Sequence, residues 1–170
     1  MIKRSSADFK DNSKIKEKKK LSKAEAYQKA CHFCAYQERT QQEARDKLYD
    51  LGLSSEEVEE LITKLIVENY INEERFAKSF AGGKFRIKKW GRNKILQELK
   101  RRNLSPYCIK KGMEEIDEND YLQVLENQAI EKSKVVKEPN LYKRKHKIAT
   151  FLISKGFEPD LVWDMVKEKC

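Results

Sequence analysis

The sequence has few of the residues that interrupt helices, and it has no long apolar run. Its 170 residues include only six glycines and three prolines, whereas charged residues make up 38% and apolar residues 39%. This composition favours a helical protein. No apolar run approaches the roughly 20 residues needed to cross a bilayer, and the N-terminus lacks the apolar stretch of a signal peptide. We therefore expect an all-α, cytoplasmic protein without a membrane partner.

Cysteine and histidine are also scarce. Cys31, Cys34, Cys108 and Cys170 are too few and too scattered for a secreted disulfide scaffold, so we expect reduced thiols. The spacing of Cys31 and Cys34, with His32 between them, is one that metal ligands use, but no second Cys/His pair follows at finger spacing. Packing of two small apolar side chains within a helix is the better interpretation. We expect no metal and no cofactor.

Signatures of catalysis are missing as well. The sequence contains no glycine-rich phosphate loop, no nucleophile elbow and no carboxylate pair that differs from the many solvated ones. We expect the protein not to be an enzyme. Its formal charge of +9 favours a polyanion, or a protein assembled on one, as the partner.

The first 21 residues are expected to form a disordered basic tail. Residues 1–20 carry eight Lys or Arg against three Asp or Glu, a net charge of +5, and only Ile2, Phe9 and Ile15 are sizeable apolar groups. Burial of so little apolar surface cannot offset the entropy of ordering the segment. Electrostatic tethering and simple solubilisation both remain open as its role.

After the tail, the sequence repeats with offsets of 51 and then 53 residues. The repeated stretches are LYDLGLSSEEV (48–58), LKRRNLSPYCI (99–109) and LISKGFEPDLV (152–162). A period in this range is typical of helical arrays. We predict three tandem three-helix repeats, at 22–71, 72–117 and 118–170.

Each repeated stretch combines a helix stop with a helix start. Gly52, Asn103 and Gly156 occupy the same position in the three copies, and these residue types most readily adopt the left-handed conformation beyond a helix end. Capping boxes predict further starts, since a glutamate follows three residues after Ser22, Thr40 and Ser54. Pro106 and Pro159 occupy first-turn positions.

The remaining helices follow from apolar spacing. We expect helices at 22–38, 40–51, 73–90, 91–102, 119–136 and 140–155, and a short helix after each stop. Two apolar series support them: Val58, Leu61, Ile62, Leu65 and Ile66, and then Phe76, Phe80 and Ile87. A three-helix unit of about 50 residues buries little surface alone, so we expect the units to lean on one another in an elongated, curved row. We expect a monomer.

The central unit resembles the RecX family of regulators of the RecA recombinase. The resemblance lies in YINEERFAKSF (70–80) and GRNKILQEL (91–99), and it extends over about residues 22 to 170. The matching residues are Glu74, Arg75, Phe76, Ala77, Phe80, Gly91, Lys94, Ile95, Glu98 and Leu99. Two features depart from the family pattern: Asn103 stands where glycine is usual, and Gly82-Gly83 interrupts the long helix.

The resemblance implies a non-enzymatic protein that lies in the helical groove of the RecA filament on single-stranded DNA. It further implies that such a protein inhibits ATP hydrolysis, filament extension and strand exchange by RecA.

Charge is segregated along the chain. Residues 84–102 carry nine basic side chains and one acid, a net charge of +8, whereas residues 54–74 carry seven acids and one lysine, a net charge of −6. A second run, 132–147, has seven basic residues and one acid. We predict that RecA or DNA is contacted by Lys84, Arg86, Lys88, Lys89, Arg92, Lys94, Lys100, Arg101 and Arg102, and by Lys143, Arg144 and Lys147.

Two other functional hypotheses stay open. One is a stand-alone nucleic-acid binder that uses a helix-turn-helix, although the corners repeat without a distinct recognition helix and 91–102 is not rich in Asn or Gln. The other is an inert helical scaffold whose lysine-rich face is merely solvated. Trp90 either stacks on a base or closes a corner between helices. Arg75 is either a structural ion-paired residue or a partner contact.

Overall fold

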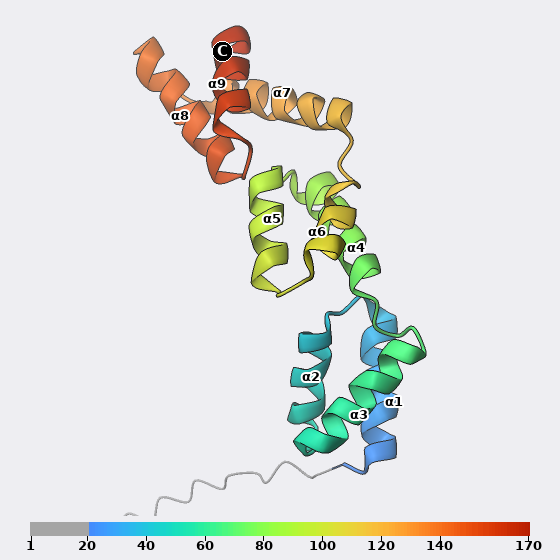
Figure 1. The fold of residues 1–170 in the computed structure, drawn as a ribbon. Coiled ribbons are helices and arrows are strands. Elements are labelled where there is room, and N and C mark those ends of the chain that lie inside the picture. The colour runs from blue at the N-terminus through green and yellow to red at the C-terminus, as the bar shows by residue number, and fades with distance from the viewer. Residues whose placement is uncertain (1–20) are drawn as a thin grey trace, which may run out of the picture.

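The structure, a computed structural model, describes residues 21–170. Within this range the chain forms nine α-helices and no β-strand, so the prediction of an all-α fold is confirmed. The helices form three three-helix units that follow one another in an elongated row (Figure 1). Residues 1–20, which hold nearly all of the predicted basic tail, lie outside the described residues.

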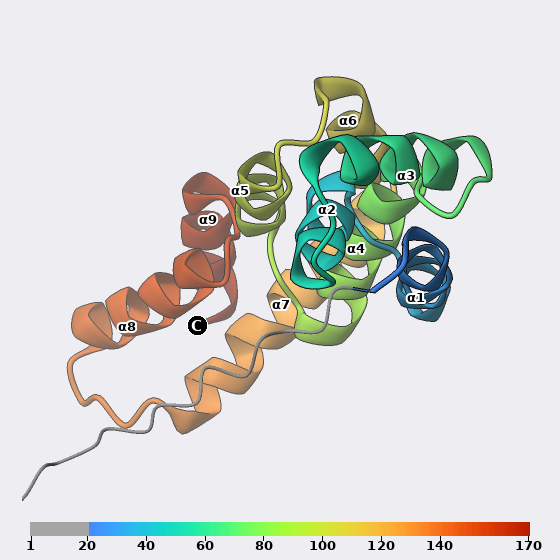
Figure 2. The ribbon, with the colours of Figure 1, turned by 90° about the horizontal axis from the view of Figure 1, so that it is seen from below.

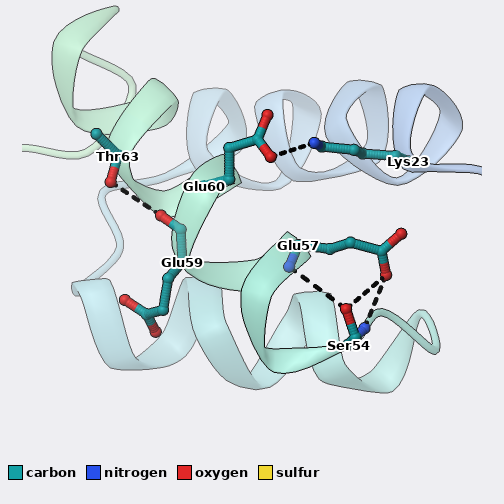
Figure 3. A network of polar contacts seen from close by, with 6 residues as sticks. All are labelled: Lys23, Ser54, Glu57, Glu59, Glu60 and Thr63. Carbon is teal, nitrogen blue, oxygen red and sulfur yellow. Dashed lines mark hydrogen bonds and ion pairs between the residues drawn. The ribbon is translucent and has the colours of Figure 1, made fainter.

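Unit 1 consists of α1 (Lys23–Tyr36), α2 (Gln41–Asp50) and α3 (Ser55–Val67). All three helices begin with the predicted capping boxes, in which Ser22, Thr40 and Ser54 accept a backbone N–H from the glutamate three residues later. Figure 3 shows this arrangement at Ser54 and Glu57, beside the ion pair of Lys23 with Glu60 that joins α1 to α3.

Unit 2 consists of α4 (Glu73–Lys88), α5 (Arg92–Arg101) and α6 (Pro106–Met113). Unit 3 consists of α7 (Glu118–Val135), α8 (Leu141–Ser154) and α9 (Pro159–Lys169). The two prolines begin α6 and α9, as predicted. The unit boundaries at 71/72 and 117/118 stay predictions.

The three predicted helix stops all have the left-handed backbone. The φ angles are +88° at Gly52, +56° at Asn103 and +95° at Gly156. Asn103 therefore takes the conformation for which the other two copies use glycine, since asparagine tolerates it better than most residues. In each copy the chain then turns and starts the last helix of the unit within a few residues.

Two residues of the apolar series that support α3 and α4 are exposed. Ile66 is 41% exposed because it lies at the edge of the buried stripe of α3, about 80° from Val58 on a helix of 3.6 residues per turn. Ile87 is 76% exposed, although it lies on the same side of α4 as Phe76. The residue buried at that end of α4 is Phe85. Apolar spacing does not identify the buried residue at this end because α4 packs on different partners along its length.

Helix α4 runs without a break through Gly82 and Gly83, so the interruption expected there does not occur. Its first half packs on α6, where Gly112 lets the two backbones approach: a Cβ on Gly112 would lie 2.7 Å from the carbonyl oxygen of Ala77. Its last turns pack on unit 3 instead, with the ring of Phe85 centred 5.9 Å from that of Tyr121. The helix thus belongs to two interfaces, one at each end.

The apolar core is divided unequally among the units. Unit 1 has its own core, to which α1, α2 and α3 contribute residues such as Ala30, Leu48 and Leu65. Units 2 and 3 share one continuous core, in which Leu99 of α5 and Leu152 of α8 are both fully buried. Units 2 and 3 are therefore joined by apolar packing, as expected for units that lean on a neighbour.

Units 2 and 3 also meet through their backbones. The N–H of Gly91 donates to the carbonyl of Lys155, and the N–H of Asn93 donates to the carbonyl of Gly156, both at 2.9 Å. A Cβ on Gly91 would overlap the backbone of Gly156 and Phe157. Glycine at position 91 is thus required by this close approach, and the start of α5 is held against the stop of α8.

Tyr121 of α7 fills the space beside this backbone contact. Its side chain is fully buried, and its ring is centred 5.3 Å from that of Phe157. Its hydroxyl donates to Glu158 and accepts the backbone N–H of Arg92 at 3.1 Å. Burial and the bond to Glu158 raise the pKa of Tyr121 above its ordinary value. The hydroxyl therefore stays protonated and links the start of α5 in unit 2 to the starts of α7 and α9 in unit 3.

The described contacts between units 1 and 2 include a polar link through Arg75 of α4. Its guanidinium donates to Glu38, just after α1, at 2.6 Å and to the carbonyl of Asn69 at 3.1 Å. Arg75 is thus an ion-paired residue at the connection, as the structural interpretation of it predicted. Figure 1 shows the start of α4 next to the C-terminal end of α1.

Cysteine 34 lies in the core of unit 1, and Cys31 is half-buried beside it. Burial raises the pKa of the Cys34 thiol to about 11. A buried, protonated thiol among apolar side chains agrees with the packing interpretation of this pair. No helix between residues 21 and 170 is long and apolar enough to span a membrane.

Replacement of Gly91 by alanine should lower the free energy of unfolding by about 1–3 kcal/mol, because the added methyl group overlaps the backbone of unit 3. Gly83 is a matched control: its Cβ would meet nothing within 4 Å, so Gly83→Ala should stabilise α4 by about 0.5–1 kcal/mol. Urea unfolding followed by circular dichroism measures both. Equal effects of the two substitutions would contradict the close approach at Gly91.

Alkylation by iodoacetamide at about pH 8 should modify Cys34 roughly two orders of magnitude more slowly than an ordinary exposed thiol, because only the thiolate reacts and burial raises the pKa of this group. Mass spectrometry of peptides after timed quenching measures each cysteine separately. In urea the difference should vanish. Rapid modification of Cys34 in the folded protein would show that the core of unit 1 opens readily.

Candidate nucleic-acid and partner interface

The nine basic residues predicted between 84 and 102 lie on two consecutive helices of unit 2. We call them the basic cluster. Lys84, Arg86 and Lys88 belong to α4, Lys89 to the corner after it, Arg92, Lys94, Lys100 and Arg101 to α5, and Arg102 to the C-terminal cap of α5. The structure therefore places six of the nine around the corner between α4 and α5, next to the contact with unit 3, and the other three, Lys100, Arg101 and Arg102, at the C-terminal end of α5.

The corner forms because α4 ends on a left-handed residue. Lys89 has φ +53°, and its N–H still bonds to the carbonyl of Phe85 at 3.0 Å. Gly91 then caps α5 in an extended conformation. Arg86 and Lys88 occupy the last turn of α4, where the negative end of the helix dipole stabilises positive charge. The sequence thus places cations where the local structure tolerates them.

Trp90 lies half-buried at this corner and packs against the shared core. Two lysines lie over its ring: the Nζ of Lys84 is 5.1 Å from the ring centroid and that of Lys94 is 4.6 Å. These are cation–π distances, so the ring helps to position both ammonium groups. Trp90 closes the corner between α4 and α5, which is one of the two roles considered for it.

Three arginines of the basic cluster are bound to acids of the chain. Arg92 pairs with Glu118 of α7 at 2.6 Å. Arg101 and Arg102 both pair with Glu98, at 3.1 Å and 2.7 Å. The hydrogen bond from Arg102 is the main cause that lowers the pKa of Glu98, followed by the nearby positive charges. These arginines therefore carry charge that the chain itself partly neutralises.

The other cations of the cluster have no carboxylate partner among residues 21–170 at ion-pair distance. Arg86, Lys88 and Lys100 are exposed. Lys84, Lys89 and Lys94 are half-exposed. The guanidinium of Arg86 lies back over Gly82, so it stays close to α4. Uncompensated positive charge therefore concentrates at the end of α4 and along the outer side of α5.

The three residues predicted in unit 3 form a second group, on the first half of α8. Lys147 pairs with Glu138 at 2.6 Å, and this bond lowers the pKa of Glu138. Arg144 donates to the carbonyl of Ser133 at 2.8 Å, whereas Lys143 is exposed. In Figures 1 and 2 the first half of α8 points away from α5, and only its C-terminal end approaches that helix. The structure does not bring this group together with the basic cluster.

The charge of Lys110 on α6 was missed by sequence reasoning. Lys110 is exposed and lines the same hollow as Lys100 of α5. Lys110 lies outside the basic run of residues 84–102, and the residue pattern of α6 does not show that α5 packs beside it. The bond from Arg92 to the hydroxyl of Tyr121 was missed for the same reason, since the two residues lie 29 positions apart.

No group of three or more His, Cys, Asp or Glu residues in the described part of the chain is arranged to hold a metal ion. The basic cluster carries positive charge that can attract phosphate groups or acidic side chains.

Comparison with known families matches the three RecX domain models in chain order. The first RecX three-helix domain matches residues 26–65, the second matches 72–113 and the third matches 118–166. These segments lie within α1–α3, α4–α6 and α7–α9 respectively.

Individual relatives agree with these matches. A regulatory protein RecX of Clostridium perfringens strain 13 is 30% identical over 131 residues, which are 76% of this chain and 61% of the relative. The chain thus spans about three fifths of the length of this relative. A regulatory protein RecX of Prosthecochloris aestuarii is 27% identical over 143 residues, 84% of this chain and 92% of the relative.

A solved structure has the same fold. The crystal structure of RecX from Lactobacillus salivarius aligns with a TM-score of 0.76 at 22% sequence identity, over 86% of this chain and 95% of that chain. The family matches to all three units, together with this likeness of fold, agree with the resemblance seen in the central unit. The chain belongs to the RecX family.

Proposed function

We propose that the protein regulates the RecA recombinase in the cytoplasm by binding the RecA filament on single-stranded DNA. It lies in the helical groove of the filament and inhibits ATP hydrolysis, filament extension and strand exchange, without catalysis of its own. The observation that carries the proposal is the basic cluster, displayed at the centre of an elongated row of three units in a chain of the RecX family.

The distribution of charge supports binding to a nucleoprotein rather than a general attraction to anions. Residues 84–102 have a net charge of +8, but residues 54–74 have a net charge of −6. The acidic stretch lies mainly on α3 of unit 1 and would be repelled by bare DNA. A partner with both phosphates and protein surface accommodates the basic and the acidic stretch, because only unit 2 need approach the phosphates.

Salt dependence distinguishes this mode from purely electrostatic binding. A protein that makes six to ten phosphate contacts loses about three to five powers of ten in affinity between roughly 50 and 200 mM salt. A partner that also buries apolar surface against the protein retains affinity at physiological salt. A protein that inhibits RecA by occupying the filament groove at physiological salt therefore requires contacts with RecA itself, in addition to the phosphate contacts of the basic cluster.

The second candidate function is a stand-alone nucleic-acid binder. One observation favours it: Asn93, Gln97 and Arg101 are all exposed and lie four residues apart along one side of α5, and such residues read base edges. A recognition helix, however, enters the major groove by its N-terminal residues. The N-terminus of α5 is covered by Lys155 and Gly156 of unit 3, which accept its first N–H bonds. This geometry favours the regulator.

The proposed function is tested with the RecA protein of the same organism. Substoichiometric amounts of the protein should inhibit DNA-dependent ATP hydrolysis by RecA at about 0.15 M salt, near physiological ionic strength. Affinity for naked single strands should be weak under the same conditions. Equal affinity for naked DNA, with no effect on preformed filaments, would support the stand-alone binder instead.

Reversal of the charges of the exposed Lys88 and the half-exposed Lys89, in the variant Lys88→Glu with Lys89→Glu, should remove most of the inhibition, because two cations at the end of α4 that have no carboxylate partner among residues 21–170 become anions that repel phosphates. The control variant Lys29→Glu with Lys167→Glu makes the same change in net charge at exposed residues of α1 and α9. Titration of each variant into the ATPase assay measures the concentration for half-inhibition. Full inhibition by the first variant would show that the end of α4 is not part of the interface.

A further inference from the structure

Helix α5 is flanked by two surface hollows that share Leu96 and Lys100. One hollow lies between α5 and the corner that joins α8 to α9, and the other lies between α5 and α6. Figure 1 shows the C-terminal end of α8 next to the start of α5, and α6 alongside α5. Leu96 and Lys100 are four residues apart, so they form one line along the exposed side of α5. We call the two hollows and this line the α5 groove.

The floor of the α5 groove is aliphatic. On the side of unit 3 it includes Ile153, which is 37% exposed. On the side of α6 it includes Ile109 and the half-exposed Met113. The one ring that lines the groove, Phe157, is fully buried and offers no face to a ligand.

The rim of the α5 groove is positively charged. Lys94, Lys100 and Lys110 line it, and none of them has a carboxylate at ion-pair distance within residues 21–170. The acid at the rim, Glu98, is already bound by Arg101 and Arg102. A ligand in the groove therefore meets apolar carbon beneath it and unneutralised ammonium groups beside it.

We propose that the α5 groove binds an acidic segment of a partner protein, whose apolar side chains enter the two hollows while its carboxylates pair with the lysines of the rim. This inference rests on the proposed function, in which the partner is a subunit of the RecA filament. Charge complementarity selects an acidic segment, and the aliphatic floor selects protein over nucleic acid. Single strands are held by aromatic rings on which bases stack, and the groove presents none.

The proposal divides the basic residues of unit 2 by partner. Lys88 and Lys89, at the end of α4, lie outside the α5 groove and face phosphates, whereas Lys100 and Lys110 face protein. The groove spans the contact between units 2 and 3, so its width depends on the bonds of Gly91 and Asn93 to unit 3. A segment seated across it would contact both units at once.

The test compares three double variants with equal change in net charge. Lys100→Glu with Lys110→Glu reverses two charges at the rim of the groove. Lys88→Glu with Lys89→Glu reverses two charges at the end of α4. Lys29→Glu with Lys167→Glu is the control. Fluorescence anisotropy measures affinity for RecA filaments assembled on single-stranded DNA and, separately, for the same strand without RecA. The groove variant should lose about tenfold or more in affinity for filaments. Its affinity for naked DNA should fall no more than that of the control.

A fourth variant, Leu96→Asn, removes apolar contact without a change in charge. Its affinity for filaments should fall in the same direction, and the loss should persist at high salt, where electrostatic contributions are screened. Thermal melting verifies that each variant is folded, and a variant that melts early is replaced by Ile153→Ser, at the exposed edge of the same groove.

Each outcome decides between ideas. If the groove variants bind filaments as the control does, the groove is not the docking site and the inference is overturned, while the proposed function stands. If the groove variants lose affinity for naked DNA and for filaments equally, the groove binds nucleic acid and the inference is also overturned. If the unmodified protein shows no preference for filaments over naked DNA, the proposed function itself fails and the inference falls with it.

Discussion

The contact of Gly91 with the stop of α8 is the constraint on which the rest of the structure depends. Two backbone hydrogen bonds of 2.9 Å and the absence of a Cβ bring the start of α5 against Lys155 and Gly156. Because the same corner carries the basic cluster, this contact fixes the cations relative to unit 3. It also sets the distance between α5 and the end of α8. The protonated hydroxyl of Tyr121 stabilises this contact, because it accepts the backbone N–H of Arg92 between the two backbone bonds.

The two connections between units differ in physical character. Units 2 and 3 share a core of apolar residues, and burial of apolar surface is the dominant favourable contribution to folding. Units 1 and 2 keep separate cores, and the link through Arg75 and Glu38 is a partly exposed ion pair. Such pairs contribute about 0–1 kcal/mol and weaken in salt. Units 2 and 3 therefore form one block, and unit 1 is held to this block by weaker forces.

Local signals in the sequence were sufficient for the ends of the helices but not for their partners. The stops at Gly52, Asn103 and Gly156 and the caps at Ser22 and Ser54 depend on a few adjacent residues, and all were predicted. The exposure of Ile87 was not, because α4 leaves α6 and meets Tyr121 of α7, a residue far away in sequence. The pairing of Arg102 with Glu98 lies within one helix turn, whereas the pairing of Arg92 with Glu118 could not be inferred from spacing.

The fold does not itself require the basic cluster. The corresponding corner of unit 1, between α1 and α2, forms without a run of basic residues, since Glu38 and Arg39 are its only charged residues. Like charges on one corner repel each other and oppose folding. Among residues 21–170, acids pair with the cluster only at Arg92, Arg101 and Arg102, and the lysines of the cluster have no carboxylate partner there. The proposed function gives a reason for this charge: the corner forms without it, and a negatively charged partner outside the chain would offset its cost in stability.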